Sequence, residues 1–400
     1  MNSDIAIVGA GPIGLFSALQ AAKLDAQVIV FEEHSSIGAP AHCTGHISIS
    51  GLNRICLSFP ANVIENKIRA VNFYSPSGYR FSVRFGSPVT YVINRELLDK
   101  YIGRMAIEQG AEILYNTHVN SLIIEDNSVV GVVVKRKKKT ENVLSKVVID
   151  AEGVSSHLLK QAGLPHLDRS MTVNGVQTEA DKIHDIDNDT VEVFLSRSFA
   201  PGFFAWIVPR RDGTAKVGLA TEKGSPRDCL CHFLRTSIVQ KRLKGSHFTN
   251  TVYHPITLGG PISRTFQNGL LVVGDAASQV KSTTGGGVIM GLTCASIAGE
   301  VAAHAAQSQN SSAKVLSTYE YKWKKKIGFD MVAMKWLRLM LNKLSNKQLD
   351  QFITLCTRLR LDESLKGAAD IDFQGTALIR LAKSPRTLAT ALYLLMTSFL

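Results

Sequence analysis

The N-terminal part of the chain alternates a short apolar run, a helical apolar pattern and a second apolar run. Asp4–Val8 is apolar and strand-like, a glycine-rich turn follows, and apolar residues then recur at helical spacing to about Leu24. Gln27–Phe31 forms the next apolar run and ends on the acidic Glu32. Two short apolar strands joined by a crossover helix predict a βαβ unit with parallel strands.

Alternating apolar and polar positions dominate the middle of the chain, together with an amphipathic helix that begins near Asn94-Arg95-Glu96. The predicted strands lie within Ala70–Phe85, Ser121–Val134, Val143–Ala151, Thr190–Leu195, Phe203–Val208 and Ala215–Ala220. Gly269–Val273 is a further apolar strand before a long helix, and from about Tyr319 the pattern is helical to the end. Segments of a nucleotide-binding domain are therefore expected to alternate with a sheet-based second domain.

The turn after the first strand has the sequence Gly9-Ala10-Gly11-Pro12-Ile13-Gly14, which is the GxGxxG fingerprint of dinucleotide binding. Gly9 permits a tight turn, Gly11 lets the backbone approach a pyrophosphate, and Gly14 lets helix and strand pack closely. Free N–H groups and the helix dipole attract the pyrophosphate to the helix N-terminus. Glu32 is 18 residues beyond Gly14, where its carboxylate can accept hydrogen bonds from ribose hydroxyls. The unit predicts a bound adenine dinucleotide.

A second element, far along the chain, favours FAD over NAD. The strand Gly269–Val273 ends in Gly274-Asp275, and Gly286 and Gly287 open the long helix. An Asp after a buried strand can hold the ribityl hydroxyls of a flavin, while the helix N-terminus faces the anionic N1–C2=O edge of the reduced ring. Simple nicotinamide dehydrogenases have no distant element of this kind. A glycine-rich turn without a ligand is the competing interpretation.

The composition excludes several classes of protein. The chain has 400 residues, of which 45% are hydrophobic and 20% charged, so a disordered or fibrous protein is excluded. Its 6 cysteines are too sparse for a disulfide scaffold, and their spacing predicts no metal site. The length suits two or three interleaved domains.

The net charge of +12 is concentrated in the C-terminal part of the chain. Residues 314–347 contain nine Lys and Arg against Glu320 and Asp330, and a second basic run, Lys135 to Lys139, is predicted at a hairpin tip. Nucleic acid or anionic lipid could each meet such a patch, and a solvated basic surface is the plain alternative.

Two apolar stretches are not expected to span a membrane. Gly285–Ala306 contains Glu300 and small residues suited to a packed helix, and Leu388–Leu400 is shorter than the roughly 20 residues that a span needs. A helix could still lie on a membrane surface with its apolar side down. Its apolar residues at helical spacing would be Met331, Met334, Leu337, Leu341 and Leu344. A globular helix packed on the second domain has the same pattern.

Several motifs give the chain a resemblance to a known family over roughly residues 3–330. They are Ile37–Gly45 with Pro40 and Cys43, Tyr91–Arg95 with Asp99, Val148–Ser156, Gly274–Ala277 with Thr284–Gly287, and Ala200–Pro209. The sequence resembles the geranylgeranyl reductase family of FAD-dependent oxidoreductases, within the aromatic hydroxylase-like flavoprotein superfamily. It differs at Glu152, where the motif usually has Asp, at Ser282, where Pro is frequent, and at Phe204 and Val208 in the YxWxFP motif.

The resemblance implies an α/β fold with a Rossmann-like FAD-binding domain interleaved with a β-sheet substrate domain and a helical C-terminal region. The FAD-binding domain would comprise residues 1–70, 91–165 and 255–310. The substrate domain would comprise residues 71–90 and 166–254, and the basic helical region residues 311–400.

The resemblance also assigns roles to residues. The cofactor-binding residues would be Gly9, Gly11, Gly14, Glu32, His42, Cys43, Gly45, Arg95, Val119, Asp275, Gly286, Gly287 and Val288. Phe204 and Trp206 would bind substrate, on one face of a strand whose other face carries Phe203 and Ala205. Cys43 would give a proton or order the water that does so, against the alternative of an inert packed cysteine.

The implied reaction is reduction of isolated double bonds in geranylgeranyl chains of lipids or their precursors. Hydride would come from reduced flavin N5, and the electron donor would be NAD(P)H, a deazaflavin or a ferredoxin. A lipid substrate implies an anionic membrane surface as partner and no nucleic acid, and free thiols fit a reducing cytoplasm. The alternatives are a flavin monooxygenase or halogenase, and a non-catalytic FAD electron carrier.

Overall fold

The computed structural model describes residues 2–137, 139–367, 372–381 and 385–399. The strands of its larger sheet are β1 (Asn2–Val8), β2 (Val28–Phe31), β8 (Glu112–Leu114), β9 (Thr117–Glu125), β10 (Ser128–Arg136), β11 (Lys139–Asp150), β17 (Phe266–Gln267) and β18 (Leu270–Val272). β18, β11, β1, β2 and β8 are parallel neighbours in that order. β9 and β10 continue from β11 as antiparallel strands, and the basic run predicted at a hairpin tip lies where β10 meets β11.

Three helices pack against one face of this sheet. They are α1 (Pro12–Ala22), α3 (Arg95–Glu108) and α7 (Val288–Gln307), and their apolar sides share one core with β1 and β2. Asn94 caps α3 by accepting a hydrogen bond from the Leu97 N–H at 3.0 Å. The predicted βαβ unit, the helix at Asn94 and the helix after Gly287 are therefore confirmed.

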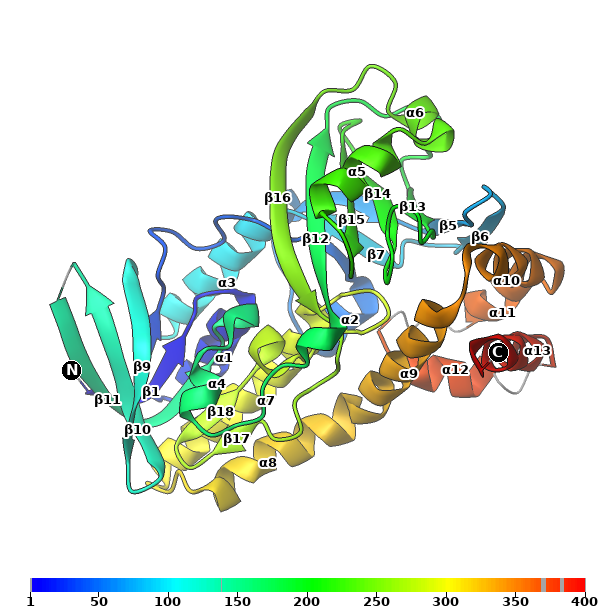
Figure 1. Cartoon of the computed structure of the whole chain (residues 1–400). Coiled ribbons are helices and arrows are strands. Elements are labelled where there is room, and N and C mark those ends of the chain that lie inside the picture. Colours follow the sequence, from blue (N-terminus) through cyan, green and yellow to red (C-terminus); the bar gives the residue numbers. More distant parts are fainter. Residues whose placement is uncertain (1, 138, 368–371, 382–384, 400) are drawn as a thin grey trace.

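A second sheet stands above the first in Figure 1. It contains β5 (Ala70–Tyr74), β6 (Arg80–Arg84), β12 (Thr172–Ala180), β13 (Thr190–Phe194), β14 (Ala205–Pro209), β15 (Ala215–Thr221) and β16 (Phe248–Thr257), in the order β16-β12-β15-β14-β13-β5-β6. Helices α5 (Pro226–Leu234) and α6 (Ser237–Arg242) pack on one face. The other face carries a separate apolar cluster that includes Phe203 and Trp206.

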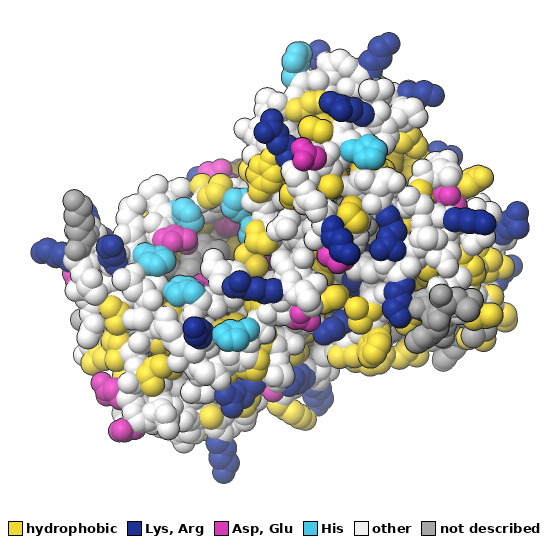
Figure 2. Space-filling model, in the orientation of Figure 1, with side chains coloured by type: hydrophobic (Ala, Val, Ile, Leu, Met, Phe, Trp, Pro, Cys, Tyr) yellow, Lys and Arg dark blue, Asp and Glu magenta, His cyan; other side chains and the backbone are white. Residues whose placement is uncertain are grey.

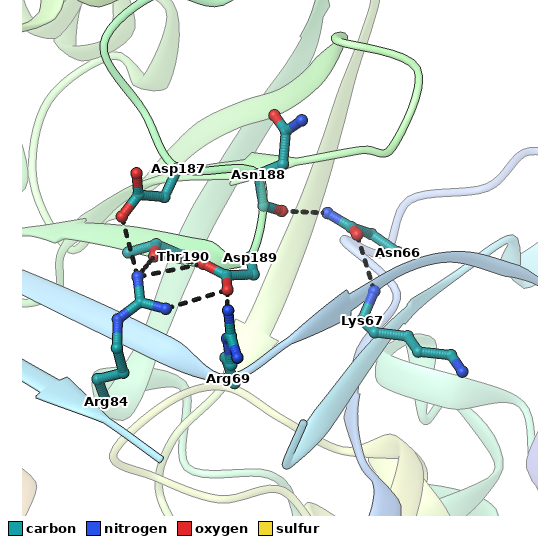
Figure 3. A network of polar contacts seen from close by, with 8 residues as sticks. All are labelled: Asn66, Lys67, Arg69, Arg84, Asp187, Asn188, Asp189 and Thr190. Carbon is teal, nitrogen blue, oxygen red and sulfur yellow. Dashed lines mark hydrogen bonds and ion pairs between the residues drawn. The ribbon is translucent and has the colours of Figure 1, made fainter. Parts of the chain in front are cut away.

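A network of ion pairs fixes the parallel pairing of β5 with β13 (Figure 3). Asp189 precedes β13 and bonds to Arg69, which precedes β5, and to Arg84 at the end of β6. Although partial burial opposes it, the two guanidinium groups lower the pKa of Asp189 to about 2. The network holds β5 and β6 to the rest of the second sheet, and residues of both strands line the cavity between the sheets.

Smaller elements connect the two sheets. They are β3 (His46–Ser48), β4 (Ile64–Ile68) and β7 (Thr90–Ile93), which form a small sheet, α2 (Ile49–Arg54), α4 (Leu158–Gln161), and the 3-10 turns Ala61–Val63, Gly153–Ser155, Arg169–Met171 and Gly274–Ala277. The boundaries of the predicted domain division stay a prediction.

The C-terminal part is helical, as predicted from Tyr319 onward. Its helices are α8 (Ala313–Trp323), α9 (Phe329–Lys343), α10 (Asn346–Arg358), α11 (Leu361–Gly367), α12 (Gln374–Leu381) and α13 (Pro385–Phe399). A π-helical segment, Lys324–Gly328, joins α8 and α9 into one long oblique rod (Figure 1). Leu400, the end of one predicted apolar stretch, lies outside the described residues.

Among the described residues, α7 has the length and composition of a membrane span. However, 78% of its most apolar window is buried inside the protein. It is therefore packed as a core helix, as the small residues of 285–306 predicted.

Candidate active site

A cavity of about 1470 Å³ extends between the two sheets and onward to the C-terminal helices. Figure 2 shows histidine side chains gathered around a hollow between the larger sheet and the second sheet. The cavity-lining histidines include His34, His42, His118, His157 and His254. Most predicted site residues also line this cavity: Gly9, Gly11, Glu32, His42, Cys43, Arg95, Val119, Phe204, Trp206, Asp275, Gly286, Gly287 and Val288.

The glycine-rich turn after β1 has the geometry that a pyrophosphate site needs. A Cβ on Gly9, where φ is +96°, would meet the Ala151 carbonyl oxygen at 2.6 Å, and one on Gly14 would meet the Gly9 oxygen at 2.0 Å. Nothing lies within 4 Å of a Cβ on Gly11. Gly14 therefore packs α1 against the turn outside the cavity, while Gly11 exposes its backbone to the cavity at the start of α1.

Glu32 is fixed at the end of β2 by its neighbours. Its Oε2 accepts a hydrogen bond from the Ala10 N–H at 2.8 Å, and its Oε1 accepts one from the His34 N–H at 2.9 Å. Glu32 as a whole is 8% exposed and lines the cavity next to the glycine-rich turn. Its position beside that turn suits a ribose of a dinucleotide.

The flavin end of the cavity lies between β18 and α7. A Cβ on Gly287 would come within 2.8 Å of the Asp275 Oδ1, so glycine is required beside this carboxylate. Burial raises the pKa of Asp275, an effect that Arg95 opposes, and no described residue donates a hydrogen bond to its carboxylate. No side chain caps α7, whose first turn faces the same space. An acceptor without a donor and an uncapped helix N-terminus fit the ribityl hydroxyls and the pyrimidine edge of FAD.

Cys43 lies on the loop that covers this end of the cavity. The Gly45 N–H donates a hydrogen bond to the Cys43 Sγ at 3.3 Å. Gly45 is not among the residues that line the cavity. It has φ +75°, and a Cβ there would meet the Ile93 oxygen at 2.1 Å. Its role is to hold the loop against β7.

Arg95 brings positive charge to the same loop. Its guanidinium pairs with Asp99 at 3.0 Å. Burial alone would lower the pKa of Arg95, but Asp99 and Cys43, both within its reach, raise it. The His42 ring stacks on His254 at 5.0 Å, which joins the loop to β16. Burial is the main cause that lowers the pKa of both histidines.

His46 lines the cavity, and its exposed surface is consistent with that position although many protein atoms surround the ring. Its Nε2 lies 2.6 Å from the Thr90 Oγ1. Burial, with a smaller effect of Lys281, lowers the pKa of His46 to about 4, so the ring is neutral near pH 7. A neutral imidazole can accept or donate a proton.

The aromatic motif differs from the predicted alternation. Gly202 has φ +82°, and β14 begins only at Ala205, so Phe203 and Phe204 lie in the turn before the strand. Their rings stack at 4.2 Å, and Phe204 meets the Trp206 ring edge-on at 6.0 Å. The prediction that Phe203 lies on the opposite face from Trp206 is therefore wrong: the three rings form one cluster on the cavity wall.

The prediction of which side of the basic helix would face a membrane is also wrong in part. Met331 and Leu344 are 1% and 0% exposed, and Met334 is 0% exposed, because this side of α9 packs inward. The exposed apolar residues of α9 are instead Phe329, Val332 and Trp336, at 55%, 57% and 61%.

Several charged residues at the site could not be predicted from any pattern in the sequence. The Lys281 Nζ contacts the Asp372 Oδ1 at 2.8 Å, and Arg54 contacts Asp372 at 3.2 Å. Arg338 of α9 also lines the cavity. In the sequence it is recognisable only as one of the basic residues of segment 314–347. The one related signal was the departure at Ser282, which lies next to Lys281.

Two buried carboxyl groups lie at the end of β11, where Asp150 is the last residue of the strand and Glu152 follows it. The Glu152 N–H donates to the Asp150 Oδ1 at 3.1 Å, and the Leu158 N–H donates to the Glu152 Oε1 at 2.9 Å. Burial is the largest cause that raises the pKa of Asp150 and raises the pKa of Glu152 to about 7. His157 pairs with Glu152 at the cavity rim.

The comparisons with known proteins agree with this geometry. Residues 4–189 match the FAD dependent oxidoreductase family, and residues 171–252 match the geranylgeranyl reductase catalytic domain. The digeranylgeranylglycerophospholipid reductase 2 of Methanothermobacter thermautotrophicus is 35% identical over 361 residues, which cover 88% of this chain and 91% of that protein. Reductase 2 of Methanopyrus kandleri is 31% identical and covers 96% of this chain and 99% of that protein.

Solved structures share the fold. A geranylgeranyl bacteriochlorophyll reductase-like protein from Thermoplasma acidophilum has a TM-score of 0.88 at 24% identity, covering 98% of this chain and 99% of that one. A flavin-dependent brominase has a TM-score of 0.72 at 18% identity, covering 93% and 94%. The fold and the dinucleotide site thus define an FAD-dependent oxidoreductase. Within that class, the chain belongs to the geranylgeranyl reductase family.

Proposed function

We propose that the protein saturates isolated double bonds in the geranylgeranyl chains of membrane lipids or their precursors. One observation carries the proposal: the cofactor end of the cavity continues into a long apolar arm. The arm lies between the second sheet and the C-terminal helices, and its lining includes Phe73, Phe81, Leu195, Phe352, Ile353, Leu361 and Leu394. Such a lining suits a flexible hydrocarbon chain, because it offers apolar contact along its length.

The residues around the flavin end would divide the chemistry among them. When bound, reduced FAD supplies a hydride from N5 to one alkene carbon, and the other carbon must take a proton. Glu32, Asp275 and the first turn of α7 would hold the cofactor. The ring faces of Phe203, Phe204 and Trp206 would exclude water and stabilise positive charge that develops on the alkene.

We propose Cys43 as the source of the proton, directly or through a water that it orders. Its Sγ lies on the loop that lines the flavin end, with Arg95 beside it. The stacked His42 and His254 line the cavity next to this loop and can pass protons inward. A packing role for Cys43 is the alternative that the variant described in the Discussion tests.

The lipid would enter from a membrane surface. Phe329 and Trp336 line the cavity and are also exposed, so the apolar arm opens on the outer side of α9. The exposed Lys324, Lys325 and Lys326 lie immediately before α9. Exposed aromatic residues beside lysines are suited to the headgroup layer of an anionic membrane. The electron donor stays a prediction among NAD(P)H, a deazaflavin and a ferredoxin.

Anaerobic reoxidation of the reduced protein tests the function. A geranylgeranyl lipid should restore the absorbance of oxidised flavin, whereas the fully saturated analogue should not. Trp206→Ala should slow this step with little effect on reduction by dithionite, and Tyr253→Ala, on the exposed side of β16, should leave both unchanged. Reoxidation only by oxygen with hydroxylation of a small aromatic would instead identify a monooxygenase. Reduction without reoxidation by any lipid would identify an electron carrier.

A further inference from the structure

Arg338 is a buried cation with neutral partners. It is 4% exposed, and its Nε donates to the Ser282 carbonyl oxygen at 2.9 Å while its Nη2 donates to the Thr283 oxygen. Its Nη1 reaches the Gly202 oxygen at 3.5 Å and the Asn342 Oδ1 at 3.3 Å. Within the described ranges of the chain, no carboxylate forms an ion pair with it. Burial therefore lowers the pKa of Arg338 to about 10.

Other buried cations of this protein have acidic partners. The pairs are Arg95 with Asp99 at 3.0 Å, Lys281 with Asp372 at 2.8 Å, Lys216 with Glu65 at 3.0 Å, and Arg242 with Glu192. A buried charge without a counter-charge is unfavourable unless a bound group supplies one. The surroundings of Arg338 therefore suit a negative charge that comes from outside the chain.

The position of Arg338 indicates which group that is. The two carbonyls it binds lead directly into Thr284–Gly287, the loop at the flavin end of the cavity. Its guanidinium stacks over the Phe203 ring at 4.6 Å, and the same ring lies 3.4 Å from a Cβ built on Gly285. Lys281 and the partly exposed Arg54 share the Asp372 carboxylate, so this carboxylate does not neutralise Arg338 as well. Arg338 thus adds one uncompensated positive charge beside the flavin loop.

We propose that Arg338 stabilises the anionic, reduced form of the bound FAD and fastens the flavin loop to α9. A charge near N1 of a flavin changes the relative stability of its redox states. The planar guanidinium can hold two successive carbonyls and keep its charge, which a lysine cannot do with the same geometry. The inference rests on FAD binding and not on the identity of the lipid.

The midpoint potential of the bound flavin tests the proposal, with the dissociation constants of oxidised and reduced FAD as a second measurement. Arg338→Gln keeps hydrogen-bond donors but removes the charge. In this variant the ratio of the affinities for reduced and oxidised FAD should fall at least tenfold. A tenfold fall lowers the midpoint potential of this two-electron couple by about 30 mV. Arg338→Lys should weaken both redox forms but shift the potential less. Lys335→Met, on the same helix but outside the cavity lining, should change neither.

Three results would overturn the proposal. An unchanged potential in Arg338→Gln would mean that the counter-charge is another group, such as a lipid phosphate. Equal shifts in the Gln and Lys variants would assign the effect to hydrogen-bond geometry instead of charge. If Arg338→Gln retains no FAD, the dissociation constants of oxidised and reduced FAD from the wild-type protein test the proposal instead. Tighter binding of oxidised than of reduced FAD would contradict a stabilised anion. None of these measurements depends on turnover of a lipid.

Discussion

Asp275 is a carboxylate on the cavity wall, and we expect bound FAD to supply hydrogen-bond donors to it. Asp275→Ala should weaken FAD binding by roughly 1.5–3 kcal/mol, about ten- to hundredfold, because a charged hydrogen bond is lost. Asp275→Asn, which keeps an acceptor oxygen, should lose less, and Cys43→Ala should lose less than either. Fluorescence titration of apoprotein with FAD measures all three. Equal affinities for FAD in the Ala variant and the wild type would remove Asp275 from the site.

Cys43 is tested through the proton that the reaction consumes. A general acid typically accelerates a reaction by about 10²–10⁴-fold, so Cys43→Ser should slow flavin reoxidation by lipid to that extent. FAD binding and reduction by dithionite should be retained. Cys56→Ser, at an exposed cysteine outside the cavity lining, is the matched control. A loss well below tenfold would give Cys43 a packing role only.

Glu152 makes stability depend on pH. Its pKa is raised from 4.5 to about 7, so its protonated form stabilises the fold below pH 4.5 and this contribution is lost as the pH rises through 7. His46, with a lowered pKa, acts in the opposite direction below pH 6.5. The difference between wild type and Glu152→Gln reports the Glu152 carboxyl group together with its effect on the neighbouring Asp150. From pH 5 to pH 8 the wild type should lose about 1–3 kcal/mol more of unfolding free energy than the variant.

Chemical denaturation of the FAD-saturated protein at both pH values measures this difference. Glu108→Gln changes an exposed carboxyl group on α3 and should behave as the wild type. A pH dependence in Glu152→Gln equal to that of the wild type would show that another group is responsible.

Roles of residues that follow from local spacing could be predicted from the sequence, whereas contacts between distant segments could not. The glycine-rich turn and Glu32 belong to one βαβ unit, so their spacing is informative. Arg338 and Ser282 are 56 positions apart, and the contact depends on how α9 crosses the molecule. Lys281 meets Asp372 across 91 positions. No local pattern records such pairs.

At the scale of elements, α9 shows why helical spacing alone does not identify a membrane face. Its two apolar sides have similar patterns in sequence, and only packing decides which is buried. Met331 and Met334 face the core, whereas Phe329, Val332 and Trp336 are exposed on the other side. The aromatic motif similarly lacks the expected alternation. Gly202 has φ +82°, and Phe203 and Phe204 lie between this turn and the start of β14.

The exposed side of α9 should therefore carry membrane binding. The protein should bind anionic vesicles in a salt-sensitive way, and Lys325→Gln with Lys326→Gln should weaken binding by about 1 kcal/mol per residue. Trp336→Ser should weaken it further, and Tyr253→Ser, which removes an aromatic residue exposed on β16, should not. Vesicle co-sedimentation at low and high salt measures this. Equal partition onto neutral and anionic vesicles at low salt would contradict the assignment.

At the scale of the whole molecule, the cavity depends on all three parts of the chain. The larger sheet supplies the glycine-rich turn, the second sheet supplies Trp206, and the C-terminal helices supply Arg338 and the far end of the apolar arm. The order of strands and helices predicted the α/β class and the interleaving of segments. That the basic C-terminal helices reach the flavin loop could not be predicted, since their composition indicated only a charged surface.

The most direct test of the central claim is mass spectrometry of the lipid after a single anaerobic turnover. Protein with fully reduced FAD is mixed with an equimolar amount of geranylgeranyl lipid. The lipid is then extracted, and its mass is compared with that of lipid from a sample with oxidised protein. If the protein reduces the alkene as proposed, the lipid should be heavier by two hydrogen atoms and have one double bond fewer for each flavin oxidised. A lipid of unchanged mass beside oxidised flavin, or one that has gained oxygen, would contradict it.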